Sequence, residues 1–255
     1  MADELLYEVR DRVAWVTLNR PDQRNALDGE TMSGIGGAFA SAEADDGIAA
    51  IVLTGAGDKA FCAGMDLKAF ASGGTPAPKD GPGIEILMGG TYPKPVVGAA
   101  NGSAVAGGFE LLLACDLIVA ADHASFGIPE VKRGLVAAGG GVLQLPRRVP
   151  AAIALELGLT GELIDASRAY AVGLVNRVVP GADVLAEAVR LAEAIAANAP
   201  LAVRFTKEHM RAVADGRDLD VTAFEEGIRT VFSSDDAKEG ATAFAERRRA
   251  VWTGR

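Results

Sequence analysis

Residues 96–121 read VVGAANGSAVAGGFELLLACDLIVAA, and this stretch decides the fold. Short apolar runs at 96–100 and 117–121 are typical of buried strands. Between them lies Ala106-Gly107-Gly108-Phe109-Glu110, where the two glycines mark a strand-to-helix turn and residues 109–115 indicate the start of a helix. A strand, a helix and a second strand in this order predict an α/β fold with a substantially parallel sheet.

The alternation of strands and helices extends in both directions from this stretch. Apolar runs bounded by turn residues predict strands, and a longer segment with several glycines still predicts a helix. The elements expected around it are a β-hairpin of residues 5–9 and 13–18, a helix at 27–44, and strands at 48–54 and 174–179.

The chain becomes helical after Pro180. Asp183 is suited to capping a helix, Asn198-Ala199-Pro200 separates that helix from the next, and helical patterns continue at 219–232 and 235–249. The first helix has an apolar stripe of Val184, Ala188, Leu191 and Ile195. We therefore expect an α/β core in residues 1–190 and a helical region in residues 191–255 that packs on the core or on a neighbouring subunit.

Length, charge and composition exclude several classes of protein. The 255 residues suit one large domain, and 25 basic against 34 acidic residues give a net charge of −9, which argues against a nucleic-acid partner. Cys62 and Cys115 are far apart, and neither they nor the two histidines form a metal pattern. The N-terminus has no apolar signal segment, and the polar residues inside 96–121 exclude a membrane span there. We expect a cytoplasmic protein without a metal.

Two glutamates stand beside glycine turns. Glu110 lies three residues after Gly107 in the first turn of its predicted helix, and Glu130 follows Pro129 in Phe126-Gly127-Ile128-Pro129-Glu130. Either acid alone is explained by the preference of helix first turns for negative charge. A carboxylate among apolar neighbours is nevertheless costly to bury. Together with the glycine turns, the two acids indicate a site that moves protons and water.

A third glycine-containing stretch, Phe61-Cys62-Ala63-Gly64-Met65-Asp66-Leu67-Lys68, suggests a second backbone donor at Met65, beside the one at Gly107. Two such N–H groups would stabilise one oxyanion, such as the enolate oxygen of a thioester, and each is typically worth about 3 kcal/mol. Lys68 could meet a phosphate. The Pro/Gly-rich residues 72–83 predict a surface loop that forms part of the pocket wall.

These motifs, in this order, resemble the enoyl-CoA hydratase/isomerase (crotonase) family along essentially the whole chain. Further landmarks of the resemblance are Asn19-Arg20-Pro21, Asn25-Ala26-Leu27, Lys94-Pro95-Val96, Asn101-Gly102, Cys115-Asp116 and the tail from Glu239-Gly240 to Trp252. The tail is similar to the carnitinyl-CoA dehydratase branch. Residues 134–139 replace a proline-containing loop that is common in fatty-acid hydratases, and Asp22 stands where the family usually has a lysine.

The resemblance implies a spiral of ββα units followed by a helical trimerisation region, in trimers or dimers of trimers. It implies an acyl-CoA substrate, as in fatty acid metabolism, with coenzyme A as part of the substrate and no separate cofactor. It also implies the site residues. The catalytic residues would be Glu110, Glu130, Gly107 and Met65. The coenzyme A contacts would be Arg24, Ala26, Ala63, Asp66, Leu67, Lys68, Phe244 and Arg247, the last reaching a neighbouring subunit.

Because both glutamates are present, the best match is an enoyl-CoA hydratase, which adds water reversibly to a 2-enoyl-CoA. Enoyl-CoA isomerase and carnitinyl-CoA dehydratase chemistry remain open within the family. A non-catalytic protein that binds acyl-CoA or RNA is an alternative of another class, against which the paired acids and the negative charge both weigh.

Overall fold

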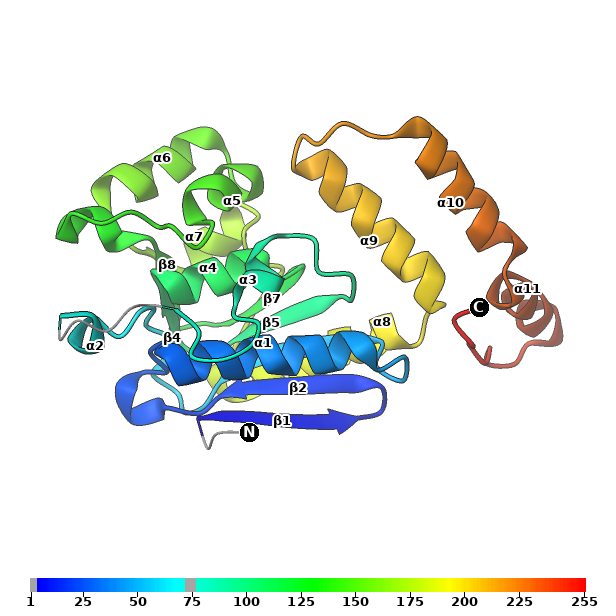
Figure 1. The fold of residues 1–255 in the computed structure, drawn as a ribbon, viewed down its shortest axis with the longest axis horizontal. Coiled ribbons are helices and arrows are strands. Elements are labelled where there is room, and N and C mark those ends of the chain that lie inside the picture. Colours follow the sequence, from blue (N-terminus) through cyan, green and yellow to red (C-terminus); the bar gives the residue numbers. More distant parts are fainter. Residues whose placement is uncertain (1–3, 72–76) are drawn as a thin grey trace.

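The computed structural model describes residues 4–71 and 77–255, without the side chains of residues 68 and 69. The chain forms two sheets with helices around them (Figure 1). The strands are β1 (Leu5–Arg10), β2 (Val13–Leu18), β3 (Ala50–Gly55), β4 (Ala60–Cys62), β5 (Val96–Ala100), β6 (Ser103–Val105), β7 (Leu117–Ala121), β8 (Ser125–Gly127), β9 (Ile164–Asp165) and β10 (Arg177–Val179). The α-helices are α1 (Gly29–Ala44), α2 (Leu67–Ala71), α3 (Glu85–Met88), α4 (Gly107–Ala114), α5 (Gly141–Arg148), α6 (Ala151–Thr160), α7 (Ala166–Ala171), α8 (Val184–Ala196), α9 (Pro200–Ala214), α10 (Val221–Ser233) and α11 (Asp235–Glu246). Three short 3-10 helices are η1 (Pro21–Gln23), η2 (Pro129–Arg133) and η3 (Gly181–Asp183).

The larger sheet has the strand order β1-β2-β3-β5-β7-β10. The predicted hairpin is confirmed, since β1 and β2 pair antiparallel with Leu5 opposite Leu18, and the turn residues Asp11 and Arg12 both have positive φ, as a tight hairpin requires. All later pairings in this sheet are parallel. The predicted strands 96–100 and 117–121 agree with β5 and β7 at both ends.

The smaller sheet, with the order β4-β6-β8-β9, positions the site. Each of β4, β6 and β8 follows a strand of the larger sheet, so the chain repeats a strand–strand–helix unit. Because β4, β6 and β8 pair in parallel, their carboxyl ends meet at one edge. The segments that leave this edge carry Met65, Gly107 and Glu130 in turn.

The core lies between the larger sheet and its helices. Helix α8 packs against β2, β3, β5 and β7, with Val184 and Ala188 buried, and α1 packs against β1 and β2. Asp183 precedes α8 as predicted, but its side chain makes no capping hydrogen bond, because its backbone is still helical in η3. The predicted strand 174–179 is shorter in the structure, since Leu174 N and Val175 N bond to Ala169 O in the turn after α7.

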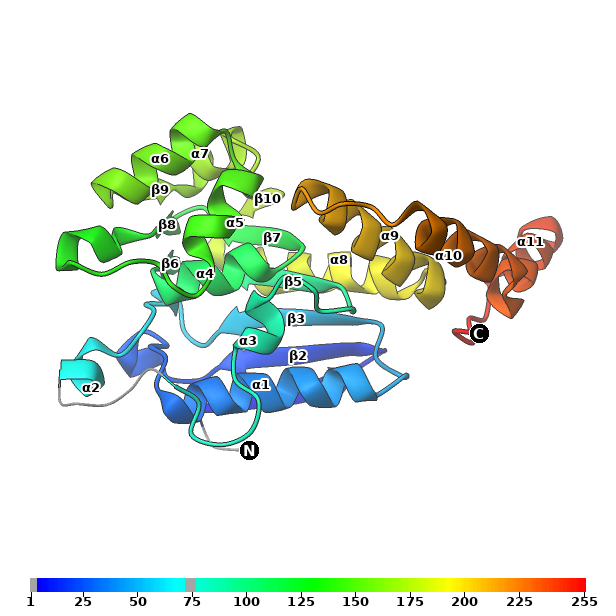
Figure 2. The same ribbon diagram turned by 45° about the horizontal axis from the view of Figure 1, so that its top comes forward.

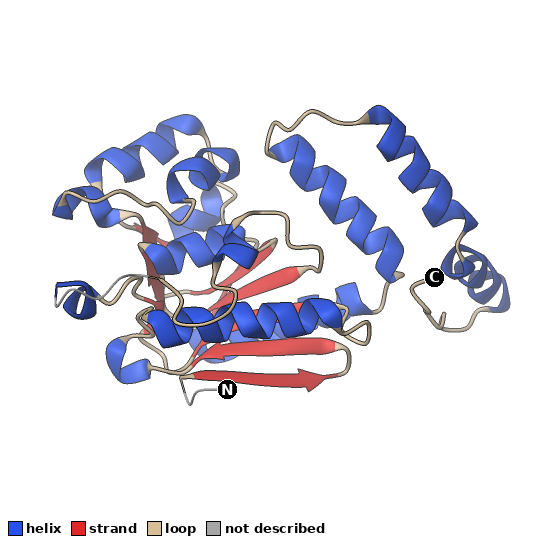
Figure 3. Ribbon diagram, in the orientation of Figure 1, coloured by secondary structure: helices blue, strands red, loops and turns tan. Residues whose placement is uncertain are grey.

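Helices α10 and α11 extend away from the core, while α9 contacts it through Lys207 and Arg211 (Figures 1 and 3). No residue of α9 or α10 is buried, and Met210 and Phe232 are among their exposed apolar side chains. Helix α11 ends at Glu246 rather than at the predicted 249, because Arg247 is left-handed and Arg248 N turns back to Ala243 O. Among the residues that the structure describes, no helix is both long and apolar enough to cross a membrane.

Candidate active site

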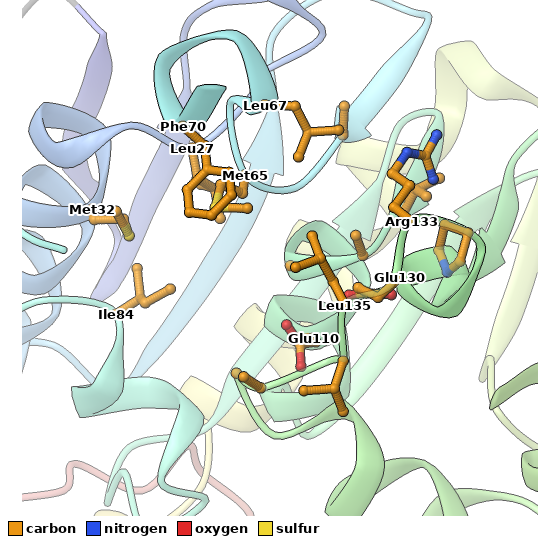
Figure 4. A pocket seen from close by; sticks show the side chains of 18 of the residues that line it. Leu27, Met32, Met65, Leu67, Phe70, Ile84, Glu110, Glu130, Arg133 and Leu135 are labelled. Atoms are coloured by element: carbon orange, nitrogen blue, oxygen red, sulfur yellow. The ribbon is translucent and has the colours of Figure 1, made fainter. Parts of the chain in front are cut away.

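A cavity of about 790 Å³ opens at the edge where β4, β6 and β8 end. Met65, Gly107, Glu110 and Glu130 all line it, so the four residues predicted as catalytic meet in one place. Figure 4 shows the carboxyl groups of Glu110 and Glu130 facing the same part of this cavity. The structure thus brings together three segments that are separated by about 20 to 45 residues in the sequence.

The two backbone N–H groups predicted as donors lie at the wall of the cavity. Within the described part of the chain, no backbone hydrogen bond uses the N–H of Met65 or of Gly107. The two segments approach closely at Gly64, where a Cβ atom would stand 2.9 Å from Gly107 N and where φ is +82°. Ala106, directly before α4, has φ +54°, a strained value for a residue other than glycine. The two N–H groups are therefore held near each other and available to a ligand.

Glu110 is buried on the first turn of α4, with 6% of the residue exposed. Its Oε1 accepts a 2.8 Å hydrogen bond from Gly141 N at the start of α5. A Cβ atom at Gly139 would stand 2.7 Å from Oε2 of the same carboxylate. Gly139 and Gly141 therefore lie against this carboxyl group, and a side chain at either position would displace it.

Glu130 reaches the cavity from η2, which begins at Pro129. Its Oε2 is buried, and no hydrogen-bond partner for it exists among the described residues. A buried polar atom without a partner is destabilising unless a ligand or water satisfies it. Glu130 as a residue lines the cavity together with Glu110.

Burial raises the pKa of both acids above the ordinary value of a glutamate. For Glu110, desolvation is the largest cause, the Gly141 N–H opposes it, and the negative charge of Glu130 raises the pKa further. For Glu130, desolvation again dominates, and the charge of Arg133 opposes it. Two interacting acids with raised pKa values are suited to proton transfer near neutral pH. Both acids lie at the same part of the cavity, so we assign no separate acid and base.

The rest of the cavity wall is largely apolar. The residues that the sequence did not single out come from α1, α2, α3 and the loop before α5, and many are labelled in Figure 4. They include Met32, Phe70, Ile84, Met88 and Leu135. Such a wall suits a hydrocarbon group. The predicted loop contributes little within the described residues: 72–76 lie outside them, and 77–83 do not line the cavity.

The predicted coenzyme A contacts other than Lys68 divide into three groups. Ala63 and Leu67 line the cavity. Arg24, Ala26 and Asp66 do not line it but are next to it in the chain: Arg24 O accepts from Ala63 N at 3.0 Å, and Asp66 pairs with Arg20 at 3.7 Å. The side chain of Lys68 lies outside the described part of the structure.

Phe244 and Arg247 form the third group. They lie at the end of α11, which Figure 2 shows far from α2, and neither lines the cavity of the same chain. Phe244 is 87% exposed. One chain alone therefore does not bring these two residues to the site.

Sequence reasoning missed the enclosure of Glu110 by residues 139–141 and the presence of Arg133 at the cavity. A signal existed for the first, because three consecutive glycines stand directly before a helix, and glycine there is typical of close approach to a functional group. For Arg133 the signal was its place on the same short 3-10 helix as Glu130, three residues later, where side chains share a face.

Several known proteins are similar to this chain. Carnitinyl-CoA dehydratase of Salmonella typhi is 42% identical over 256 residues, covering 94% of each chain. Carnitinyl-CoA dehydratase of Citrobacter koseri is 41% identical over 271 residues and covers both chains completely.

Solved structures agree with this likeness. An enoyl-CoA hydratase from Mycobacterium tuberculosis H37Rv matches with a TM-score of 0.91 and 49% identity, over 99% of this chain and 100% of the other. A carnitinyl-CoA hydratase from Mycobacterium avium matches with a TM-score of 0.78 and 43% identity over the whole of both chains. The predicted fold of ββα units is thereby confirmed as that of enoyl-CoA hydratases. The sequence profile of the enoyl-CoA hydratase/isomerase family matches residues 8–255. The chain belongs to the enoyl-CoA hydratase/isomerase family.

Proposed function

We propose that this protein is an enoyl-CoA hydratase, a hydro-lyase that adds water reversibly to the double bond of a 2-enoyl-CoA thioester. The single observation that carries the proposal is that two backbone N–H groups, at Met65 and Gly107, and two carboxyl groups, at Glu110 and Glu130, line one cavity. Hydration of a conjugated thioester uses all four groups, because the donors bind the developing enolate oxygen and the acids move the protons of water.

The thioester oxygen binds between the N–H groups of Met65 and Gly107. Attack of water at C3 moves negative charge from the double bond onto this oxygen, so the two donors bind the enolate more strongly than the substrate. One such donor is typically worth about 3 kcal/mol of transition-state stabilisation. Gly107 begins α4, and the positive end of the helix dipole acts in the same direction.

Glu110 and Glu130 hold the water molecule between them and move its protons. The hydroxyl group of water forms the new bond to C3, and the proton that leaves it is taken up by the carboxyl pair. A proton from the same pair is delivered to C2, which restores the pair to its starting charge. No separate cofactor takes part, since coenzyme A belongs to the substrate.

The coenzyme A moiety binds along the segments that lead into the cavity. Ala63 and Leu67 line this entrance, while Arg24, Ala26 and Asp66 belong to the neighbouring backbone. Lys68 would meet a phosphate group. Phe244 and Arg247 would complete the coenzyme A site of a neighbouring subunit, which their distance from the cavity of their own chain and the exposure of Phe244 support.

The protein would accordingly work as a homotrimer or a dimer of trimers in the cytoplasm, in fatty acid metabolism. The exposed apolar residues of α9, α10 and α11 support this assembly, because a helix pair without buried side chains needs a partner surface. We keep residues 1–190 as the core with the thioester site and residues 191–255 as the oligomerisation region.

Carnitinyl-CoA dehydratase is the second candidate, since two similar proteins carry this name. Its acyl group bears a trimethylammonium, which proteins usually bind with several aromatic rings or an additional carboxylate. Of the described residues lining the cavity, Phe70 is the one aromatic residue, and the acids are Glu110 and Glu130. This wall favours an uncharged alkyl group.

Crotonyl-CoA tests the proposal, because hydration abolishes the absorbance of its conjugated thioester. We expect turnover of crotonyl-CoA and of longer 2-enoyl-CoAs, and much slower turnover of crotonobetainyl-CoA. Glu110→Gln and Glu130→Gln should each lower kcat by roughly 10²–10⁴-fold. Equal turnover by the wild type and Glu130→Gln would contradict the two-carboxylate mechanism, and conversion of a 3-enoyl-CoA without hydration would favour an isomerase.

A further inference from the structure

Two arginines from different parts of the chain hold the C-terminal end of α4. The last carbonyl groups of any helix lack partners within the helix. Arg148, the last residue of α5, donates from Nη2 to Leu113 O at 2.8 Å and also to Cys115 O. Arg211, in α9, donates from Nη2 to Cys115 O at 2.7 Å and to Ala114 O at 3.2 Å. Both cations also complement the negative end of the helix dipole.

Asp116 fixes Arg211 in this position. Its Oδ1 accepts from Arg211 Nε at 3.1 Å, and its Oδ2 lies 2.7 Å from Lys207 Nζ. The same carboxylate accepts from Val96 N at 2.8 Å, at the start of β5, and Lys207 donates to Lys94 O at 2.6 Å. The three charged side chains are 13–17% exposed, so solvent screens their attraction much less than that of a surface pair.

The N-terminal end of α4 carries the proposed chemistry. Gly107 supplies one of the two backbone donors, and Glu110 lies in the first turn. Helix α5 touches both ends of α4, because its first residue, Gly141, donates to Glu110 and its last residue, Arg148, binds the carbonyl groups at the other end. Helix α4 has eight residues, about 12 Å at 1.5 Å per residue. A helix this short is rigid. A displacement of its C-terminal end therefore also displaces Gly107 and Glu110 at its N-terminal end.

We propose that Arg211, Arg148, Asp116 and Lys207 are positioning residues for the hydration, and that the docking of α9 on the core sets the catalytic geometry through them. This inference rests on the proposed function. It assigns a catalytic consequence to α9, none of whose residues lines the cavity. When Arg211 is withdrawn from Cys115 O, the C-terminal end of α4 loses one of the two arginines that bind its carbonyl groups. None of the four residues lines the cavity of the proposed site, so they would act on the reaction through α4.

The test compares Arg211→Gln and Arg211→Lys with Arg217→Gln. Arg217 follows α9 and pairs with Asp215 at 3.5 Å, so its variant makes the same chemical change near the same helix without touching α4. A displacement of reacting groups by about 1 Å can lower the rate about 100-fold. We expect Arg211→Gln to lower kcat for crotonyl-CoA by 10- to 100-fold with KM within about twofold of the wild type. Arg211→Lys, which can still pair with Asp116, should recover part of the loss, and Arg217→Gln should match the wild type.

Infrared spectra of bound butyryl-CoA distinguish a positioning role of Arg211 from a merely structural role. This saturated thioester cannot be hydrated, and its carbonyl stretching frequency reports the hydrogen bonds from Met65 and Gly107. We expect the frequency shift on binding to be smaller in Arg211→Gln than in the wild type. An unchanged kcat and an unchanged carbonyl frequency, in a variant that binds butyryl-CoA, would overturn the inference.

Size-exclusion chromatography accompanies both measurements. If Arg211→Gln changes the assembly, Arg148→Gln is the second variant, because Arg148 belongs to α5 and binds the same end of α4. At an unchanged assembly this variant must lower kcat and the carbonyl shift, and wild-type values would again overturn the inference. Failure of the proposed function is a separate outcome, since in that case the wild type itself would not hydrate crotonyl-CoA.

Discussion

The N–H of Gly141 donates a 2.8 Å hydrogen bond to Oε1 of Glu110, and this contact joins the start of α5 to the first turn of α4. It satisfies one oxygen of a buried carboxylate and leaves the group facing the cavity beside Glu130. The contact links residues 31 positions apart, so the position of the Glu110 carboxyl group depends on how the loop before α5 folds over α4.

Gly141→Ala should lower activity and also lower stability. A Cβ atom at this position would stand 3.0 Å from Glu110 Oε1 and 2.9 Å from the Cβ of Ala137, so the carboxyl group must move. We expect kcat for crotonyl-CoA to fall by roughly 10- to 100-fold. The free energy of unfolding should fall as well, because the new Cβ atom overlaps the Cβ of buried Ala137 and overpacking typically costs about 1–3 kcal/mol.

Gly37→Ala is the matched control for that variant. Gly37 lies within α1, and a Cβ atom there would have nothing within 4 Å. Its kcat should equal that of the wild type. A Gly141→Ala enzyme with wild-type kcat would mean that the activity does not depend on the exact position of the Glu110 carboxyl group.

Arg133→Gln should move the acidic limb of the pH profile. The charge of Arg133 lowers the pKa of Glu130, in opposition to the larger effect of burial, so its removal raises that pKa. The limb of kcat/KM that reports this acid must therefore move to higher pH. Because Arg133 is exposed, 1 M salt should shift the wild-type profile toward that of the variant.

Lys132→Gln serves as the control for Arg133. Lys132 is the preceding residue on the same short helix, but its Nζ pairs with Glu162 at 2.6 Å. Its variant should keep the wild-type profile in low salt. If both variants shift the profile equally, the effect comes from the general charge of this surface and not from Arg133.

The sequence predicted the elements that carry long or sharply bounded apolar runs, such as residues 96–100 and 117–121. It also predicted that Glu110 and Glu130 would meet, because glycine turns and first-turn acids are local features. The smaller sheet could not be recognised in this way, since β4, β6 and β8 have three residues each and show no periodicity.

Contacts between distant segments could not be predicted from the sequence either. The enclosure of Glu110 by residues 139–141 and the bond between Arg211 and Asp116 join positions 29 to 95 residues apart. Each depends on the packing of complete helices, which a single sequence does not encode locally. The end of α11 at Glu246 escaped prediction for a related reason, because Arg247 adopts a left-handed conformation that glycine usually signals.

Glu110→Gln should gain stability relative to the wild type as the pH rises. Burial raises the pKa of Glu110 above its ordinary value of 4.5, so between 4.5 and the raised value the folded state holds more protons than the unfolded state. The free energy of unfolding of the wild type therefore falls as the pH rises through this window. Because glutamine does not ionise, the variant does not lose stability in this way. Urea unfolding at pH 4 and pH 7 measures the free energy of unfolding of both proteins. From pH 4 to pH 7 the difference between them should shift in favour of the variant. An equal difference at both pH values would exclude a raised pKa at Glu110.

Lys94→Met should destabilise the core far more than an exposed lysine does. Lys94 is 1% exposed, and its Nζ donates 2.6 Å hydrogen bonds to Ala42 O and Asp45 O at the C-terminal end of α1. Methionine fills a similar volume but leaves these carbonyl groups without their charged partner, which costs about 2 kcal/mol. For a domain of this size the loss lowers Tm by roughly 4–8 °C. Lys132→Met removes an exposed pair with Glu162 instead, and exposed pairs contribute less than about 1 kcal/mol. Calorimetry of both variants at equal protein concentration distinguishes the two sites, and equal shifts in Tm would show that the buried lysine does not anchor α1.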